Sequence, residues 1–395
     1  MIKTNSGVIN VIPKEEFAMR TKKIQQSMDE HDIDVLIAHG CECESANIRY
    51  LSDFWCVFDF VGIVIPKVGQ PIFLTGGPES YDFAKRFSKI EDIRVHPLYV
   101  ETSAPVWDKP TDQYSFTKLF DELRQKFDIK KIGIANENII PYKIVKDIEK
   151  SAPDAVFVCA DDIIMKARWY KSKNEIAMLK KAYEITEDAV IKAVDAIRPG
   201  ISEAELEAIW RGEIYRLGAE GTSYPVWITS GPSTYQSLCR STDRRIEEND
   251  MVQITLGAKY KGYCGNMCRA VVLGEIPQRH MNMIEVALEC TQETLEAIKP
   301  GVAFKDVYER FRLRLERSGF PNSNLYGPAH GTGLQECEGP WVDNRTDMVF
   351  EPGMVFNVDI WIADDRYGIR FEDGIIITET GTEILTNYRR EIIRK

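Results

Sequence analysis

The sequence lacks any long apolar run free of charged residues, and it lacks an excess of basic residues. No uncharged apolar stretch approaches the roughly 18 residues that a membrane span needs. The formal net charge of −11 excludes a basic nucleic-acid footprint and disfavours binding to an anionic membrane surface. The first residues, MIKTNSGVINVIPKEEF, contain no apolar signal-peptide core. We therefore expect a cytoplasmic protein with neither a nucleic-acid nor a membrane partner.

Histidine is also scarce, which limits the side chains that can exchange protons near neutral pH. The chain has five histidines, at positions 31, 39, 96, 280 and 330. Its nine cysteines are an odd number scattered along the chain, a distribution typical of reduced intracellular thiols. Cys41-x-Cys43 and Cys264-x3-Cys268 are closely spaced, but no second matching pair follows either. A structural zinc site is therefore not expected.

The composition, 44% hydrophobic and 28% charged, is that of a globular protein, and 395 residues favour two domains. Residues 1–160 alternate between helical and strand patterns, which predicts an α/β domain. The expected helices cover 14–31 and 112–128. Strands are expected over 33–38, 61–65, 71–75, 131–135 and 155–160, with a loop or short strand over 47–54.

From residue 161 to 395 the pattern changes to long amphipathic helices followed by paired strands, which predicts an α+β domain. Helices are expected over 172–197, from residue 202, and over 303–318. Strands are expected over 251–260, 268–275, 354–362 and 374–380. The helix stop Arg198-Pro199-Gly200 recurs 101 residues later as Lys299-Pro300-Gly301, which suggests two related halves.

Six ordered motifs in this second domain resemble the creatinase, prolidase and aminopeptidase P family, whose catalytic domain has the pita-bread fold. The resemblance covers roughly residues 161–390 by motif, and the first domain by position and pattern. The matching segments are Lys171–Ile176, Ser230-Gly231-Pro232, Leu256–Tyr263 with Arg269, His330–Leu334 with Glu338–Pro340, Glu351–Phe356, and Glu372-Asp373.

The family's metallopeptidases hold two metal ions with two Asp, one His and two Glu. At the matching positions this chain has Thr255, Asn266, His330, Asp359 and Glu372. Two carboxylates are replaced by neutral residues, and two dications about 3.5–4 Å apart need carboxylates to offset their repulsion. The resemblance therefore implies no required metal cofactor, although His330, Asp359 and Glu372 could hold a single divalent ion.

Both accessory histidines of the family's proline peptidases are also replaced, by Leu238 and Cys337. The altered site resembles that of the metal-free creatinase-like enzymes. The main expectation is a metal-independent hydrolase that cleaves a C–N bond in a small guanidino, amidine or amide compound. The alternatives are an Xaa-Pro aminopeptidase or dipeptidase-like enzyme with one metal ion, a lyase of the same fold, and a catalytically inactive binding module.

The resemblance places three catalytic residues, His330, Glu372 and Asp359. His330 would act as a general acid or base, and a buried Asp359 should have a partner. Arg370 would pair with an acid or bind a substrate carboxylate, and Cys337 is a pocket residue or a nucleophile. The remaining substrate-binding candidates are Thr255, Asn266, Glu338 and Phe58.

A homodimer is expected as well. In creatinase, a segment of the first domain reaches the active site of the other subunit. Residues 50–54 resemble that segment. The aromatic residues 54–60 that follow, which include Phe58, are expected in the core, at the dimer interface, or as a lid over the substrate of the partner subunit.

Overall fold

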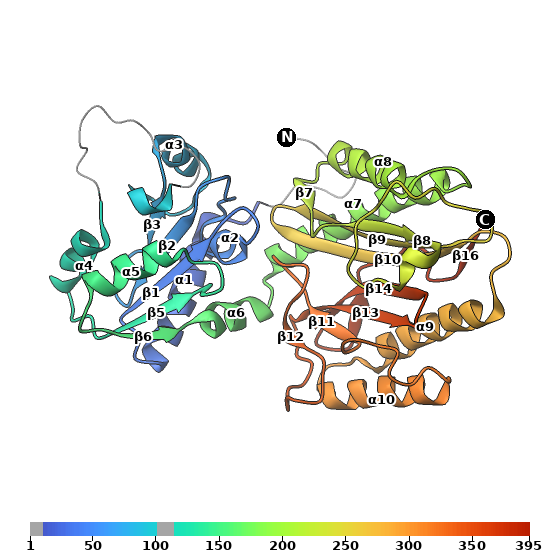
Figure 1. Cartoon of the computed structure of the whole chain (residues 1–395). Coiled ribbons are helices and arrows are strands. Elements are labelled where there is room, and N and C mark those ends of the chain that lie inside the picture. Colours follow the sequence, from blue (N-terminus) through green and yellow to red (C-terminus); the bar gives the residue numbers. More distant parts are fainter. Residues whose placement is uncertain (1–10, 101–113) are drawn as a thin grey trace. The chain divides into compact units, whose positions relative to one another are not determined.

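The computed structural model describes residues 11–100 and 114–395, which form two compact units, 11–168 and 169–395 (Figure 1). The boundary expected after residue 160 precedes helix α6 (Asp161–Trp169), whereas the units divide near its end. Buried Arg168 explains the difference, because its guanidinium donates to Asn47 Oδ1 at 2.8 Å and ties α6 to the N-terminal unit. Within the described ranges, no helix combines the length and apolarity needed to cross a membrane. The first ten residues of the segment examined for a signal peptide lie outside these ranges.

The N-terminal unit is an α/β layer structure around a mixed sheet. In the described residues the strand order is β4-β3-β2-β1-β5-β6. Strand β1 is antiparallel to β2 and parallel to β5, and every β1 residue is buried. The elements are α1 (Lys14–Glu30), β1 (Val35–Gly40), α2 (Ala46–Ser52), β2 (Val61–Pro66), β3 (Ile72–Thr75), α3 (Pro78–Phe87), β4 (Asp92–Val95), η1 (Pro97–Tyr99), α4 (Phe116–Arg124), β5 (Lys131–Ala135), α5 (Tyr142–Ser151) and β6 (Val156–Cys159).

Two predicted elements of this unit need correction. Residues 47–54 are not a loop or strand, because Ala46–Ser52 form the short helix α2, all of whose residues are buried. Asp53 ends this helix in the left-handed conformation (φ 61°), and Arg20 donates to the carbonyl of Tyr50 at 2.9 Å. Tertiary packing overrides a sequence with weak helix preference here. The helix predicted over 112–128 is shorter, Phe116–Arg124, and residues 112 and 113 lie outside the described ranges.

The C-terminal unit is a curved sheet with helices packed on it. Helix α7 packs against β9 and β10, and α9 packs against β13 and β14 (Figure 1). Its elements are α7 (Lys173–Ala196), α8 (Glu203–Arg216), β7 (Gly221–Thr222), β8 (Trp227–Ser230), η2 (Gly231–Tyr235), β9 (Met251–Tyr260), β10 (Tyr263–Val272), α9 (Gln278–Ala297), α10 (Phe304–Arg317), β11 (Ala329–Gly331), β12 (Glu338–Trp341), β13 (Val355–Ala363), β14 (Gly368–Ile377), β15 (Thr382–Ile384) and β16 (Ile393–Arg394).

Local signals explain where the long helices begin. Ser172 and Glu175 form a reciprocal capping box at the start of α7, and Ser202 and Glu205 form another at the start of α8. Both helices begin within one residue of their predicted starts. Strand β14 extends from Gly368, so it begins six residues before the predicted strand at 374, and it includes Glu372 in its interior.

The register of the sheet decides which side chains meet. The main strand order of the described residues is β12-β11-β13-β14-β10-β9-β7. Thr255 on β9 pairs with Cys268 on β10, which pairs with Glu372 on β14, which pairs with Asp359 on β13. Directly paired residues of neighbouring strands project to the same face of a sheet. One row across four strands therefore brings together residues more than a hundred positions apart.

Candidate active site

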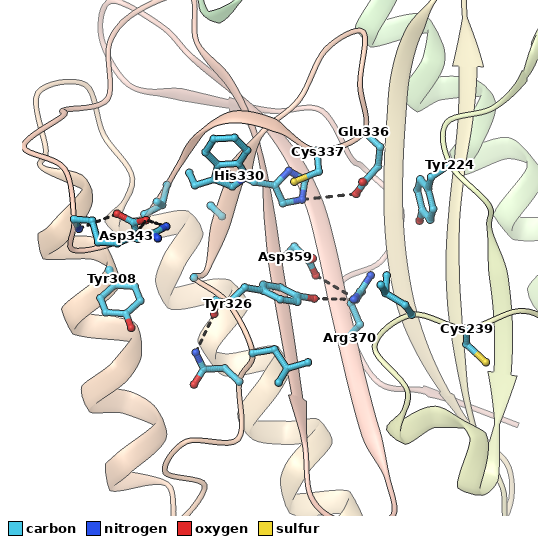
Figure 2. A pocket seen from close by; sticks show the side chains of 18 of the residues that line it. Tyr224, Cys239, Tyr308, Tyr326, His330, Glu336, Cys337, Asp343, Asp359 and Arg370 are labelled. Atoms are coloured by element: carbon cyan, nitrogen blue, oxygen red, sulfur yellow. Dashed lines mark hydrogen bonds and ion pairs between the residues drawn. The ribbon is translucent and has the colours of Figure 1, made fainter. Parts of the chain in front are cut away.

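A cavity of about 1020 Å³ opens in the C-terminal unit, and its wall combines aromatic side chains with charged groups (Figure 2). His330, Glu336, Cys337, Asp359 and Arg370 line it together. The aromatic and apolar part of the lining includes Tyr224, Trp227, Tyr308, Tyr326, Trp341 and Leu238. A cavity of this size and lining suits a small organic molecule.

His330 and Glu336, which line this cavity, form a compact cluster with buried Glu372. One possible ligand atom from each lies within 4.8 Å of the other two. The His330 Nδ1 atom lies 3.0 Å from the carbonyl oxygen of Gly331, which leaves Nε2 to face Glu336 at 3.8 Å. Glu372 Oε1 accepts a hydrogen bond from Asn357 Nδ2 at 2.9 Å. Its second oxygen, Oε2, is buried with no hydrogen-bond partner among the described residues.

The pKa values of the cluster are shifted because several acidic side chains are buried close together. Burial, followed by the neighbouring Asp359 and Glu336, raises the pKa of Glu372 well above its usual value. Burial also raises the pKa of Glu336, although His330 opposes this. Burial alone would lower the pKa of His330, but Cys337, Glu336 and Asp359 outweigh it and raise that pKa well above its ordinary value. Figure 2 shows Cys337 beside the His330 ring.

Asp359 belongs to a different interaction, an ion pair with Arg370. The Arg370 Nε atom lies 3.4 Å from Asp359 Oδ1, and both side chains are less than a tenth exposed. Arg370 Nη2 also donates to the Tyr326 hydroxyl at 2.7 Å and to the Ser237 carbonyl at 3.1 Å. The expected partner of Asp359 and the expected structural pairing of Arg370 are therefore the same contact, made between adjacent strands β13 and β14.

The single-ion ligand set expected from the sequence, His330, Asp359 and Glu372, stays a prediction, and the structure groups His330 and Glu372 with Glu336 rather than with Asp359. The buried guanidinium of Arg370 already neutralises Asp359, and Asp359 is not part of the compact cluster. Glu336 takes its place, and the motif comparison missed it because the family pattern assigns no ligand there. The available signal was a carboxylate six residues after His330, in the same loop as Cys337.

The other predicted site residues are distributed unevenly. Thr255 and Asn266 are fully buried behind the wall and do not line the cavity. Thr255 Oγ1 accepts from Gln253 Nε2 at 3.2 Å, while Asn266 Oδ1 has no hydrogen-bond partner in the described part of the chain. Glu338 is not on the wall either, because it forms a buried ion pair with Lys171 at 3.0 Å. Phe58, 63% exposed, lies in the N-terminal unit.

The donor groups can be tested against the metal that the fold implies. Two ions would need bridging carboxylates, but Thr255 and Asn266 are neutral and Asp359 is committed to Arg370. This part of the chain does not fit a dinuclear centre. One imidazole nitrogen and two carboxylates do fit one divalent ion, and the unpartnered Glu372 Oε2 is the kind of atom that such an ion would satisfy.

The two units and this cavity define a two-domain hydrolase with a pita-bread catalytic domain. Residues 177–379 match the model of metallopeptidase family M24, and residues 20–169 match the creatinase/prolidase N-terminal domain. This chain belongs to that family, a family of enzymes that hydrolyse C–N bonds, as expected from its motifs.

Known relatives agree along almost the whole length. An Xaa-Pro dipeptidase of Pyrococcus horikoshii is 30% identical over 384 residues, 95% of this chain and 98% of that protein. The crystal structure of the prolidase from Pyrococcus horikoshii OT3 superposes with a TM-score of 0.81 at 28% identity, covering 95% of this chain and 100% of that one. An X-Pro aminopeptidase from Thermotoga maritima gives 0.80 at 26% identity, covering 95% and 99%.

Proposed function

We propose that this protein hydrolyses the amide C–N bond of a small, dipeptide-like substrate with the help of one divalent metal ion. The observation that carries the proposal is the cluster that two cavity-lining residues, His330 and Glu336, form with buried Glu372. A divalent ion held by these residues would act as a Lewis acid on the substrate carbonyl. The names of the relatives, Xaa-Pro dipeptidase and X-Pro aminopeptidase, support the choice of an amide bond.

The charges around the cavity support a substrate that carries a carboxylate. Arg370 is committed to Asp359, and Arg345 donates to Asp343 Oδ2 at 2.7 Å. Arg240 also lines the cavity, and its guanidinium has no hydrogen bond or ion pair among the described residues. We assign Arg240, rather than Arg370, to the substrate carboxylate, because only Arg240 can bind an anion without breaking an existing pair.

One observation favours a second candidate, the metal-independent hydrolysis of a small C–N compound. Arg370 already places a positive charge beside Asp359, so this carboxylate does not need a metal ion for charge balance. Thr255 and Asn266 are neutral and add no negative charge that would attract a metal ion. In that case His330 carries the acid–base chemistry and delivers a proton to the leaving nitrogen, a role that typically contributes ~10²–10⁴ in rate.

Metal removal separates the two candidates. The purified chain is stripped with a chelator, and its metal content is measured before it is assayed on Xaa-Pro dipeptides, other dipeptides, guanidino acids and cyclic amidines. The proposal predicts loss of dipeptide hydrolysis and its return with about one equivalent of manganese, zinc or cobalt. Full activity in the stripped protein would contradict it and favour the second candidate, and two tightly bound equivalents would contradict the single-ion site.

A pair of variants tests the ligands themselves. Glu336→Gln should weaken metal binding by ~100-fold or more, because even residues behind the ligands are worth about 10–100-fold. Asp343→Asn is the matched control, since Asp343 lines the same cavity but pairs with Arg345 outside the cluster. Calorimetric titration with Mn²⁺ measures both variants, and equal affinities would remove Glu336 from the site.

We also propose that the chain is a homodimer, in which residues 54–60 contribute to the active site of the partner. The exposed fractions of Trp55, Val57 and Phe58, 40%, 38% and 63%, support a surface that is covered in an assembly. Light scattering at micromolar concentration should give twice the 45.2 kDa chain mass. A monomer at that concentration would oppose the shared site.

A further inference from the structure

A turn in the N-terminal unit holds two cysteine thiols side by side. Residues 41–45 join strand β1 to helix α2, and Cys41 and Glu44 exchange two backbone hydrogen bonds of 3.0 and 3.2 Å. The turn is also closely packed, because a Cβ at Gly40 would lie 2.4 Å from Ile48 of α2. Within this turn the Sγ atoms of Cys41 and Cys43 are 3.1 Å apart. An approach of about 1 Å would bring them to disulfide bond length.

The two thiols differ in their access to solvent. Cys43 is exposed, whereas Cys41 is only 8% exposed. Burial and the contact with Cys43 raise the pKa of Cys41 to about 11. An oxidant from solution therefore reaches Cys43 first. Cys41 then reacts only with a mixed disulfide already formed on Cys43.

We infer that Cys41 and Cys43 form a dithiol–disulfide site that small disulfide compounds oxidise. The Cys43 thiolate attacks one sulfur of the compound, which forms a mixed disulfide and releases one thiol. Cys41 then loses its proton to solvent and attacks the Cys43 sulfur, which closes the protein disulfide and releases the second thiol. The protein loses two protons and two electrons, and the small disulfide takes up both to become two thiols.

The surroundings of the pair specify which oxidant suits it. Glu42 and Glu44 flank Cys43, so negative charge accumulates around the reacting sulfur. This charge disfavours an anionic disulfide and favours a neutral one. The inference does not rest on the proposed hydrolysis, because every residue it uses belongs to the turn at 41–45.

The test uses the full chain and a neutral probe, 2-hydroxyethyl disulfide. After incubation at neutral pH, free thiols are alkylated and the protein is digested without reductant for mass spectrometry. The peptide with Cys41 and Cys43 should lose two hydrogens and carry no adduct. Exposed Cys159 and Cys337 serve as internal controls, since neither has a thiol partner in the described structure, and both should keep the adduct.

Variants then assign the order of attack. Cys41→Ser should retain at least ~10-fold more adduct on Cys43 than the parent, because the second thiol is gone. Cys41→Ala should behave in the same way, which guards against a disturbed turn in one variant. A stable adduct on Cys43 in the parent would overturn the proposal. Two unmodified thiols at Cys41 and Cys43 while Cys159 is already modified would overturn it as well.

Discussion

An acidic residue introduced at position 255 should remain uncharged in the folded protein unless a metal ion binds beside it. Thr255 is fully buried, its oxygen accepts from Gln253, and it lies 3.4 Å from Cys268 Sγ. In Thr255→Asp, the new carboxyl would have to share Arg370, which already acts on neighbouring Cys268 and pairs with Asp359, unless an ion binds. We therefore expect it to stay protonated in the folded protein at neutral pH and to ionise when the protein unfolds.

The loss in the free energy of unfolding can be estimated from the shift in the pKa of this carboxyl. Keeping a carboxyl with an ordinary pKa of about 3.9 neutral up to pH ~7 costs about 1.36 kcal/mol for each of ~3 pH units, or roughly 4 kcal/mol. At roughly 2–4 °C per kcal/mol for a domain of this size, the melting temperature should fall by about 8–16 °C. The folded pKa is raised, so the penalty begins above the unfolded pKa and disappears in acid.

Thermal melts with a chelator and with Mn²⁺ provide the assay. An ion at a hundredfold excess over its dissociation constant should restore about 2.7 kcal/mol, provided that it binds only the folded state. Thr291→Asp is the matched control, because Thr291 is equally buried on α9 and donates to Ala287 far along the chain from the site. The reasoning is refuted if Thr255→Asp melts like the parent in chelator, or if Mn²⁺ rescues Thr291→Asp to the same extent.

Two further predictions concern stability. Asp373→Asn should lower the unfolding free energy by about 3–5 kcal/mol in urea titrations, because it removes the buried charge 2.8 Å from fully buried Arg269. Glu309→Gln, at an exposed pair, should leave the urea midpoint nearly unchanged, and equal losses in the two variants would contradict this. Burial lowers the pKa of His39 to about 3 and that of His96 to about 4. Between pH ~6.5 and ~4.5, only the unfolded chain binds protons at these two histidines. The free energy of unfolding should therefore fall as the pH falls through this range, by up to about 2.7 kcal/mol per pH unit for the two histidines together. His39→Gln should halve that slope.

The sequence was sufficient for the elements whose signals are local. The α7 and α8 helices begin at Ser-x-x-Glu capping boxes, and β1 and β2 are short apolar runs between turn residues. Helix α2 was missed because its stability comes from complete burial rather than from helix propensity. The cytoplasmic location stays a prediction.

The motifs predicted which positions belong to the site. They did not predict which side chains contact one another there. The motif singled out His330 and Glu372, which the structure brings into one cluster with Glu336, and the burial argument required a partner for Asp359. Which partner it takes depends on the register of β13 and β14, which pairs Asp359 with Glu372 and places Arg370 diagonally across. Glu336 extends from a loop between β11 and β12, where no periodicity indicates the direction of a side chain.

The repeated helix stop seen in the sequence divides the catalytic unit into an earlier half, which contributes β9 and β10, and a later half, which contributes β13 and β14. The neutral replacements, Thr255 and Asn266, both belong to the earlier half. His330, Glu336 and Glu372 all belong to the later one. In the proposed single-ion site, every donor group therefore comes from the later half, and the earlier half supplies none. Substitutions at the earlier-half residues that line the cavity, such as Tyr224, Trp227 and Leu238, can then change which substrate the protein accepts without altering the proposed donor groups.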